Sequence, residues 1–147
     1  MTIKSFFGKY RFLSNFWPVD VTFDGEVYPT VEHAYQAAKT MSKAARRKIC
    51  LLETPGEAKR YGKKVKLRSD WEDVKIPIMR SLVRQKFSRP DLAQMLLETG
   101  DSDIIEGNTW GDTFWGTCYG VGLNHLGKIL MQIRDELRGI STNQWWE

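Results

Sequence analysis

Residues 19–39 read VDVTFDGEVYPTVEHAYQAAK and carry the clearest secondary-structure signals in the chain. Apolar and polar residues alternate around Asp24-Gly25, a pair typical of the two-residue turn of a β-hairpin. Thr30 follows, and a threonine hydroxyl can cap the start of a helix. We therefore predict a hairpin over residues 19–28 and a helix from Val31 to about Met41.

One face of this predicted helix is polar and ionisable. At about 100° per residue, four side chains share it: Glu32, Tyr35, Gln36 and Lys39. The opposite side is rich in alanine and suits close packing. A purely structural interpretation is that Glu32 and Lys39 stabilise the helix dipole at its two ends. A functional interpretation gives the carboxylate and the amine a part in chemistry, and the helix alone leaves both open.

The rest of the chain is predicted to be mainly helical. Strands do not alternate regularly with helices, as they would in a doubly wound parallel sheet, so the expected fold class is α+β. The length of 147 residues fits one domain over residues 1–147. Pro55-Gly56 predicts a turn, and the aromatic tail over residues 143–147 either packs on the body or meets a partner. Further helices are expected over residues 42–52, 57–64, 74–87, 90–100 and from Asn124 as N-cap, with a short strand over residues 103–106.

The composition is that of an ordinary globular protein. No apolar run reaches the roughly 20 residues of a membrane span, and the N-terminus does not resemble a signal peptide, so a cytoplasmic location is expected. Cys50 and Cys118 have no metal-binding spacing and are predicted to be buried thiols. No zinc motif is present, so neither a metal nor a cofactor is expected.

The net charge of +4 arises largely from a basic middle segment. These side chains either lie on solvated helix faces or attract a phosphate-bearing ligand or nucleic acid. They are Lys43, Arg46, Arg47, Lys48, Lys59, Arg60, Lys63, Lys64, Lys66 and Arg68.

Residues 106–116, EGNTWGDTFWG, combine acidic, amide and aromatic side chains with three glycines. This composition suits a loop rather than a helix or a strand. Asn108 and Asp112 are turn formers, so one interpretation is that they hold the loop itself. Trp110, Phe114 and Trp115 either plug a core or form a platform on which a base stacks.

The N-terminal residues 6–16, FFGKYRFLSNF, are also aromatic and irregular. Arg11 can pair with a phosphate through two hydrogen bonds, although a plain surface charge is the commoner case. Before the last helix, Gly120-Val-Gly122 lacks the third glycine of a dinucleotide-binding fingerprint and is a weak signal for anion binding.

Taken together, these segments resemble the NADAR family, also described as YbiA-like. The resemblance covers nearly the whole chain and rests on FLSNF at residues 12–16, on residues 24–39, and on residues 105–116, in this order and spacing. It implies a YbiA-like single domain and an N-glycosidase that cleaves the bond between ribose C1 and an exocyclic amino nitrogen.

Two substrate classes are implied by the resemblance. One is the ribosylamino-pyrimidine phosphates of riboflavin synthesis. The other is ADP-ribose attached to guanine in DNA, RNA or free nucleotides, where some family members counteract an ADP-ribosyltransferase toxin. Such a functional link is therefore possible for this chain, and no membrane partner is expected.

The resemblance also suggests roles for individual residues. Glu32 and Asp112 are the candidate carboxylates for proton transfer and charge stabilisation, in either order. Lys39 either forms a Schiff base with C1 or binds a phosphate. The remaining candidates bind the base, the sugar or a phosphate: Arg11, Ser14, Asn15, Phe16, Tyr35, Gln36, Asn108, Trp110, Gly111 and Trp115.

Two other classes of protein fit some of these features. A non-catalytic module that binds NAD or ADP-ribose would use the same aromatic and basic residues without needing the carboxylates. A general nucleic-acid binder rests on the charge alone and predicts an affinity that falls steeply with salt.

Overall fold

The computed structural model describes residues 1–139, so the predicted role of the tail at residues 143–147 lies outside the described residues. The chain forms two compact units. The central unit comprises residues 15–86, and the terminal unit combines residues 1–14 with the chain from Phe87 onward. That the whole chain is one domain stays a prediction.

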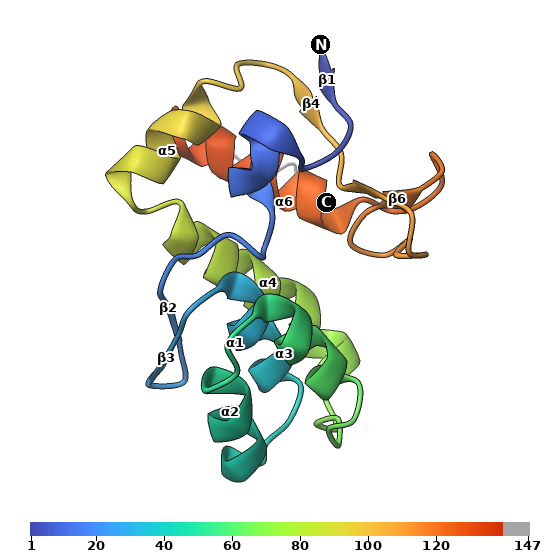
Figure 1. The fold of residues 1–147 in the computed structure, drawn as a ribbon. Helices are drawn as coiled ribbons and strands as arrows, with labels where there is room; N and C mark the ends of the chain where they lie inside the picture. The colour runs from blue at the N-terminus through green and yellow to red at the C-terminus, as the bar shows by residue number, and fades with distance from the viewer. Residues whose placement is uncertain (140–147) are drawn as a thin grey trace. The chain divides into compact units, whose positions relative to one another are not determined.

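The central unit consists of one hairpin and four helices, shown in blue to yellow-green in Figure 1. Helix α1 packs against α2, α3 and α4. The element bounds are β2 (Val21–Phe23), β3 (Glu26–Tyr28), α1 (Val31–Ala38), α2 (Lys43–Cys50), α3 (Pro55–Gly62) and α4 (Trp71–Lys86).

The predicted hairpin and helix cap are both confirmed. Strands β2 and β3 pair antiparallel, and the turn between them has positive φ at Asp24 (52°) and Gly25 (84°). The Thr30 hydroxyl accepts a hydrogen bond of 3.0 Å from the His33 amide, as an N-cap should. The helix ends at Ala38 rather than near Met41.

His33 is a structural residue. Its Nε2 lies 2.9 Å from the Leu52 carbonyl oxygen, and because a carbonyl only accepts, Nε2 carries the proton. Its Nδ1 then accepts from the Thr30 hydroxyl at 2.7 Å. Burial lowers the pKa of His33, so the ring stays neutral. The two hydrogen bonds of the ring join Thr30, at the start of α1, to Leu52, just after α2.

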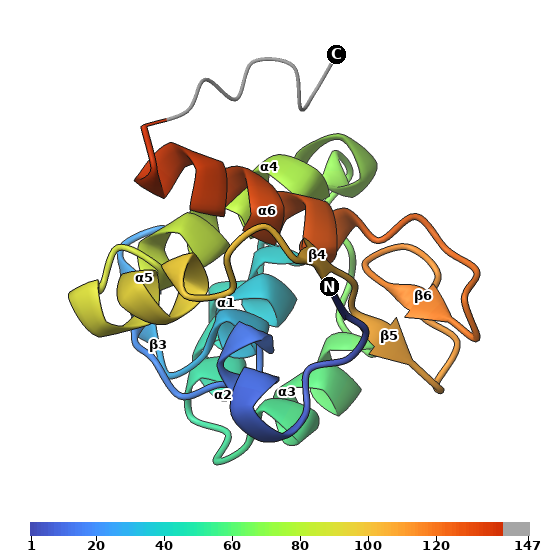
Figure 2. The ribbon, with the colours of Figure 1, turned by 90° about the horizontal axis from the view of Figure 1, so that it is seen from above.

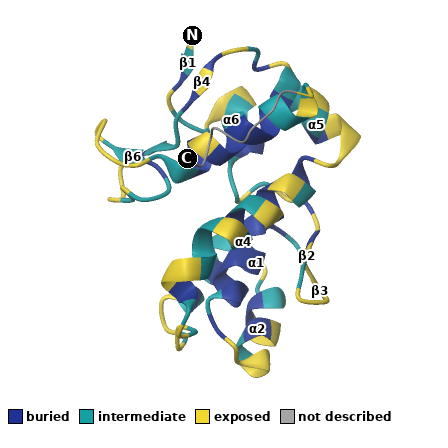
Figure 3. Ribbon diagram, turned by 180° about the vertical axis from the view of Figure 1, so that it is seen from behind, coloured by how far each residue is buried: buried dark blue, intermediate teal, exposed yellow. Residues whose placement is uncertain are grey.

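Helix α1 is buried along its whole length, which Figure 3 shows as a dark blue segment. The alanine-rich side of α1 was predicted to pack closely, but the polar face of the helix is buried as well. The backbone of α3 approaches this face: a Cβ added at Gly62 would lie 1.9 Å from Gln36 Oε1. Glycine at this position makes the close packing of α3 on α1 possible.

Two other sequence predictions are wrong. Pro55 does not form a turn but occupies the first turn of α3, a position where its missing N–H costs nothing. Cys50 and Cys118 are free thiols, but both are partly exposed rather than buried.

One member of the basic segment has a structural role. Arg46 is buried and forms an ion pair of 2.7 Å with Asp24 in the hairpin turn. Its Nε also donates to the Thr40 carbonyl oxygen at 2.8 Å. Arg46 therefore ties α2 to the hairpin, and the charge available to an anion comes from the other residues of the segment.

Up to residue 139, the terminal unit contains three helices and two pairs of short parallel strands. Figure 2 shows β5 and β6 side by side. Buried apolar side chains of α6 and of the strand pair β1–β4, such as Ile129, Ile3 and Ile104, form its core. The bounds are β1 (Thr2–Ile3), η1 (Gly8–Leu13), α5 (Pro90–Leu97), β4 (Asp103–Ile104), β5 (Gly107–Asn108), β6 (Thr117–Cys118) and α6 (His125–Leu137).

These elements confirm the predicted α+β class, helix-rich with a few short strands. Over residues 1–139, none of the helices has both the length and the apolar character that a membrane crossing requires.

Asn124 precedes α6 as predicted, but its side chain does not cap the helix. Its Oδ1 instead accepts from the Glu106 amide at 3.0 Å, and its Nδ2 donates to the Ile104 carbonyl at 2.9 Å. Gly127 lets α6 approach strand β4 closely, because a Cβ added at this position would lie 2.2 Å from the carbonyl oxygen of Ile104.

Replacing Gly127 by alanine is therefore expected to destabilise the protein, by about 1–3 kcal/mol for an overpacked site. Urea unfolding measures this free energy. Gly56→Ala is the matched control, because it also lies in a helix and its added Cβ would meet no atom closer than 3.8 Å. That control should be neutral or stabilising by up to about 1 kcal/mol, and equal effects of the two variants would contradict the packing argument.

Candidate functional site

The predicted site residues are divided between the two units. The central unit holds Asn15, Phe16, Glu32, Tyr35, Gln36 and Lys39. The terminal unit holds Arg11, Ser14, Asn108, Trp110, Gly111, Asp112 and Trp115. The predicted pairing of Glu32 with Asp112 therefore stays a prediction.

Within the central unit, Glu32 is held in place by its neighbours. Its side chain is buried, with 7% of the residue exposed. Gln36 Nε2 donates to Glu32 Oε1 at 2.8 Å, and the Glu32 amide donates to the Asn15 carbonyl at 3.1 Å. Asn15 is itself anchored, since its Nδ2 lies 3.5 Å from Met79 Sδ. The structure thus brings Asn15, Glu32 and Gln36 together, whereas Phe16 is exposed.

Lys39 follows the last turn of α1 on the same side of the helix. Its Nζ lies 5.5 Å from the centroid of the Tyr35 ring, within the range of a cation–π contact. The Tyr35 ring in turn packs on Trp71, with a centroid distance of 5.3 Å. The amine of Lys39 is therefore placed beside an aromatic wall rather than extended into solvent.

The pKa of Lys39 is lowered from its usual value. The largest cause is burial, which removes water from the ammonium group. The positive charges of Lys59, Lys63 and Lys75 lower it further, while the negative charge of Glu32 opposes them. Lys39 consequently carries a larger fraction of neutral amine than an exposed lysine at the same pH.

In the terminal unit, the loop over residues 106–116 is held by its own polar side chains. Asn108 Nδ2 donates to Glu106 Oε2 at 3.0 Å and to the Asp112 carbonyl at 2.9 Å. Asn108 Oδ1 accepts from the Asp112 amide at 3.1 Å. Asp112 Oδ1 accepts from the amides of Phe114 at 3.1 Å and Trp115 at 2.9 Å. Both predicted turn formers therefore shape the loop.

Glu106 also belongs to this network, although it is not among the site residues predicted from the sequence. A Cβ on Gly116 would lie 1.7 Å from Glu106 Oε2, so the carboxylate packs directly on that glycine. The only sequence feature that pointed to Glu106 is its position in the same loop, two residues before Asn108 and ten before Gly116.

The aromatic residues of the loop separate into two groups. Phe114 packs edge-on against Trp115, with 4.8 Å between the ring centroids, and its ring is tilted against that of His125 at 4.6 Å. Trp110, by contrast, is 56% exposed. The plug interpretation therefore fits Phe114 and Trp115, and the platform interpretation fits Trp110.

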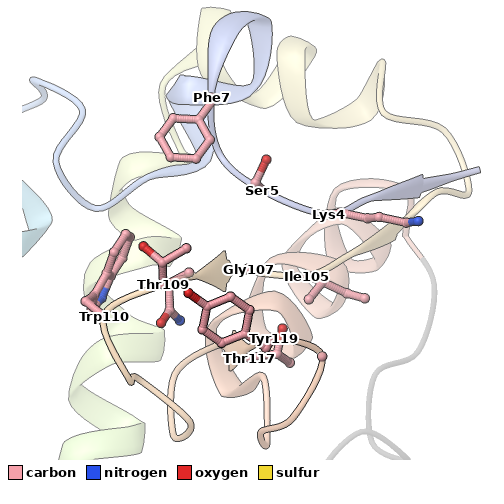
Figure 4. Close-up of a pocket in the computed structure, with 11 residues that line it drawn as sticks. Lys4, Ser5, Phe7, Ile105, Gly107, Thr109, Trp110, Thr117 and Tyr119 are labelled. Carbon is pink, nitrogen blue, oxygen red and sulfur yellow. The ribbon is translucent and has the colours of Figure 1, made fainter.

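Trp110 and Asn108 line an open cleft of about 530 Å³ in the terminal unit, shown in Figure 4. Phe7 and Tyr119 also line it, although sequence reasoning assigned neither to the site. Arg11 is exposed on η1, and the Ser14 amide donates to its carbonyl oxygen at 3.0 Å. Neither Arg11 nor Ser14 lines this cleft.

Asp112→Asn separates the structural role of this residue from a catalytic one. Asparagine keeps an Oδ1 acceptor, so the loop and the melting temperature should be preserved. If Asp112 also transfers a proton, turnover should fall about 100-fold or more. Asp112→Ala provides the comparison, since it removes the acceptor and should lower the melting temperature as well. Unchanged turnover in Asp112→Asn would restrict Asp112 to holding the loop.

Comparisons with known proteins match this chain over most of its length. The model of the NADAR domain matches residues 5–138. An N-glycosidase from Nostoc punctiforme is 41% identical over 89% of this chain and 88% of its own length. N-glycosidase YbiA from Escherichia coli is 38% identical over 87% of this chain and 82% of its own.

A riboflavin biosynthesis protein from Vibrio vulnificus is 39% identical over 88% of this chain. That protein is much longer, and the match covers only 36% of its length. The NMR structure of Escherichia coli YbiA superposes with a TM-score of 0.81 at 35% identity, covering 93% of this chain and 85% of YbiA.

Proposed function

The chain belongs to the NADAR family, and from this premise we propose that it is an N-glycosidase that hydrolyses the bond between ribose C1 and an exocyclic amino nitrogen. The observation that carries the proposal is the buried helix α1, which holds the Glu32 carboxylate and the Lys39 amine on one face. The names of the relatives from Nostoc punctiforme and Escherichia coli support the same class of reaction.

The lowered pKa of Lys39 favours a nucleophilic role over phosphate binding. A phosphate is best bound by a charged, accessible ammonium, whereas a nucleophile must be neutral when it reacts. Lys59 and Lys63 are near enough for their positive charges to lower the pKa of Lys39. These neighbouring cations therefore serve to bind the phosphate of a substrate while Lys39 reacts.

The proposed reaction starts when the N-ribosyl amine opens to an imine. Neutral Lys39 Nζ adds to C1, and the Glu32 carboxylate carries one proton from Nζ to the former imine nitrogen, which gives an aminal. The Glu32 carboxylate then carries the remaining Nζ proton to the departing nitrogen, which leaves with its bonding electrons as the free amine. C1 then remains joined to Nζ as a Schiff base.

Hydrolysis of the Schiff base completes the cycle. The Glu32 carboxylate removes a proton from the water that attacks C1 and passes it to Nζ, which gives a carbinolamine. The carbinolamine collapses to the ribose aldehyde and neutral Lys39 as its hydroxyl proton moves to Nζ, and Glu32 is ionised as at the start. One water is consumed and one C1–N bond is broken, as N-glycoside hydrolysis requires.

Two substrates are candidates for this reaction. Ribosylamino-pyrimidine phosphates are favoured by the name of the Vibrio vulnificus relative, a riboflavin biosynthesis protein. ADP-ribosylated guanine, in DNA, RNA or nucleotides, offers the same C1–amine linkage. Incubation with each substrate, followed by chromatography of the released base and sugar phosphate, tests the proposal. Release from neither would overturn it in favour of a module that only binds NAD or ADP-ribose.

The proposal makes a prediction about pH dependence. Because the neutral amine reacts, turnover should rise as the pH increases through the pKa of Lys39. Lys63→Gln removes a positive charge that lowers this pKa, so the rising limb of the curve of turnover against pH should move to higher pH. Lys64→Gln is the control, because Lys64 is an exposed neighbour that does not contribute to the lowered pKa of Lys39. A limb that stays in place in Lys63→Gln would contradict the assignment of that limb to Lys39.

A further inference from the structure

The cleft in the terminal unit exposes three aromatic rings from three separate segments. Phe7 is 67% exposed, Trp110 is 56% exposed and Tyr119 is 84% exposed. All three line the cleft in Figure 4. Rings that remain in solvent add little to folding, and a cluster of them at a concave surface is typical of a binding site.

The backbone at Tyr119 is unfavourable for a bulky residue. Cys118 and Val121 exchange two hydrogen bonds of 2.9 and 3.1 Å around a two-residue turn, where φ is 50° at Tyr119 and 81° at Gly120. The turn at Asp24-Gly25 has nearly the same angles, 52° and 84°, but uses residues that favour them. A tyrosine in this conformation is strained, and its exposed ring gains no burial in return.

The polar groups of the cleft suit an anionic ligand. Among the described residues that line it, Lys4 is charged and none carries a carboxylate. The amide of Asn108 is occupied by the loop, as described above, whereas Ser5, Thr109 and Thr117 bring hydroxyl groups. Figure 4 shows Phe7 and Trp110 on one side of the view, Lys4 on the other, and Tyr119 between them.

We propose that this aromatic cleft binds a nucleoside phosphate unit, with its base stacked on Tyr119 and Trp110 and its phosphate directed to Lys4. Aromatic stacking accepts any base, because every base has a π-face. The proposal concerns binding alone and does not depend on the chemistry at Glu32 and Lys39. A free nucleotide and one nucleotide of a single strand share this chemistry.

Isothermal titration of the full-length protein tests the proposal with three probes: adenosine 5′-monophosphate, ribose 5-phosphate, and an eight-residue oligodeoxyadenylate. The monophosphate should bind at least tenfold more tightly than ribose 5-phosphate, which has no base. An oligonucleotide that binds at least tenfold more tightly than the monophosphate would identify a single strand as the source. Equal affinities would identify the free nucleotide.

Tyr119→Asn is the informative variant, because asparagine tolerates positive φ. Its melting temperature should be unchanged or higher, while affinity for the monophosphate should fall about tenfold. Tyr119→Phe should keep the affinity, and Trp110→Ala should lose it as Tyr119→Asn does. Val121→Ala is the matched control, since Val121 is 69% exposed on the same turn and does not line the cleft. Unchanged affinity in both Tyr119→Asn and Trp110→Ala, or equal binding of ribose 5-phosphate, would overturn the proposal.

Discussion

Lys39→Arg is expected to lower the turnover of N-glycoside hydrolysis by at least 1,000-fold while leaving substrate affinity nearly unchanged. Arginine keeps the positive charge, so it can still bind a phosphate, but it is not deprotonated in proteins and cannot form the Schiff base. Steady-state kinetics with separate values of kcat and KM distinguish these two roles. A loss confined to kcat supports the nucleophile.

Lys64→Arg provides the matched control for this experiment, because Lys64 is an exposed lysine of the same basic segment. Its kcat and KM should equal those of the parent protein. If Lys39→Arg also retained full turnover, Lys39 would bind a phosphate instead of reacting with C1.

Glu32→Gln is expected to lower turnover by about 100- to 10,000-fold, the range associated with loss of a general acid–base group. Glutamine has nearly the same shape and retains an Oε1 acceptor for Gln36 Nε2, which now donates to Glu32 at 2.8 Å. The fold should therefore persist, and ligand affinity measured by titration should remain close to that of the parent. A protein that only binds its ligand would show no corresponding loss.

Glu57→Gln controls for the helix-dipole interpretation of Glu32. Glu57 also lies in the first turn of a helix that starts at a threonine cap, in this case α3. Both substitutions remove a favourable charge from a helix N-terminus, at a cost of about 0.3–1 kcal/mol in stability. Equal turnover in the two variants would reduce Glu32 to a structural residue.

Local rules predicted the hairpin and the start of α1 correctly because both depend on neighbouring residues. The Asp24-Gly25 pair favours the positive φ angles of its turn, and the Thr30 hydroxyl reaches the His33 amide three residues later. Pro55 shows how such rules can fail. Proline suits both a turn and the first turn of a helix, and the preceding Thr54 cap, which accepts from the Glu57 amide, identifies the helix.

Features that depend on distant contacts were not predictable in the same way. The sequence of α1 predicts a helix with one polar face, yet Glu32 and Gln36 on that face are buried, and α3 approaches Gln36 closely at Gly62. Asn124 has the residue type of a cap, but its side chain bonds to backbone 18 and 20 residues earlier. Periodicity and capping rules contain no information about these partners.

The candidate site shows the same division. Composition identified the loop over residues 106–116, and the resemblance identified Glu32 and Lys39 as candidates. Neither indicated Tyr119, whose interest comes from its φ angle and its exposed ring. Nor did they separate Phe114 and Trp115, which pack on each other, from the exposed Trp110.

The proposed chemistry has a direct test in trapping of the covalent intermediate. The protein is mixed with a ribosylamino-pyrimidine phosphate or ADP-ribosylated guanine in the presence of sodium borohydride, which reduces an imine to a stable secondary amine. Intact-mass and peptide mass spectrometry should then show the sugar attached to the peptide that contains Lys39, and no adduct should form in Lys39→Arg. Release of the base by the parent protein without any adduct, or an adduct on another lysine, would contradict the role proposed for Lys39.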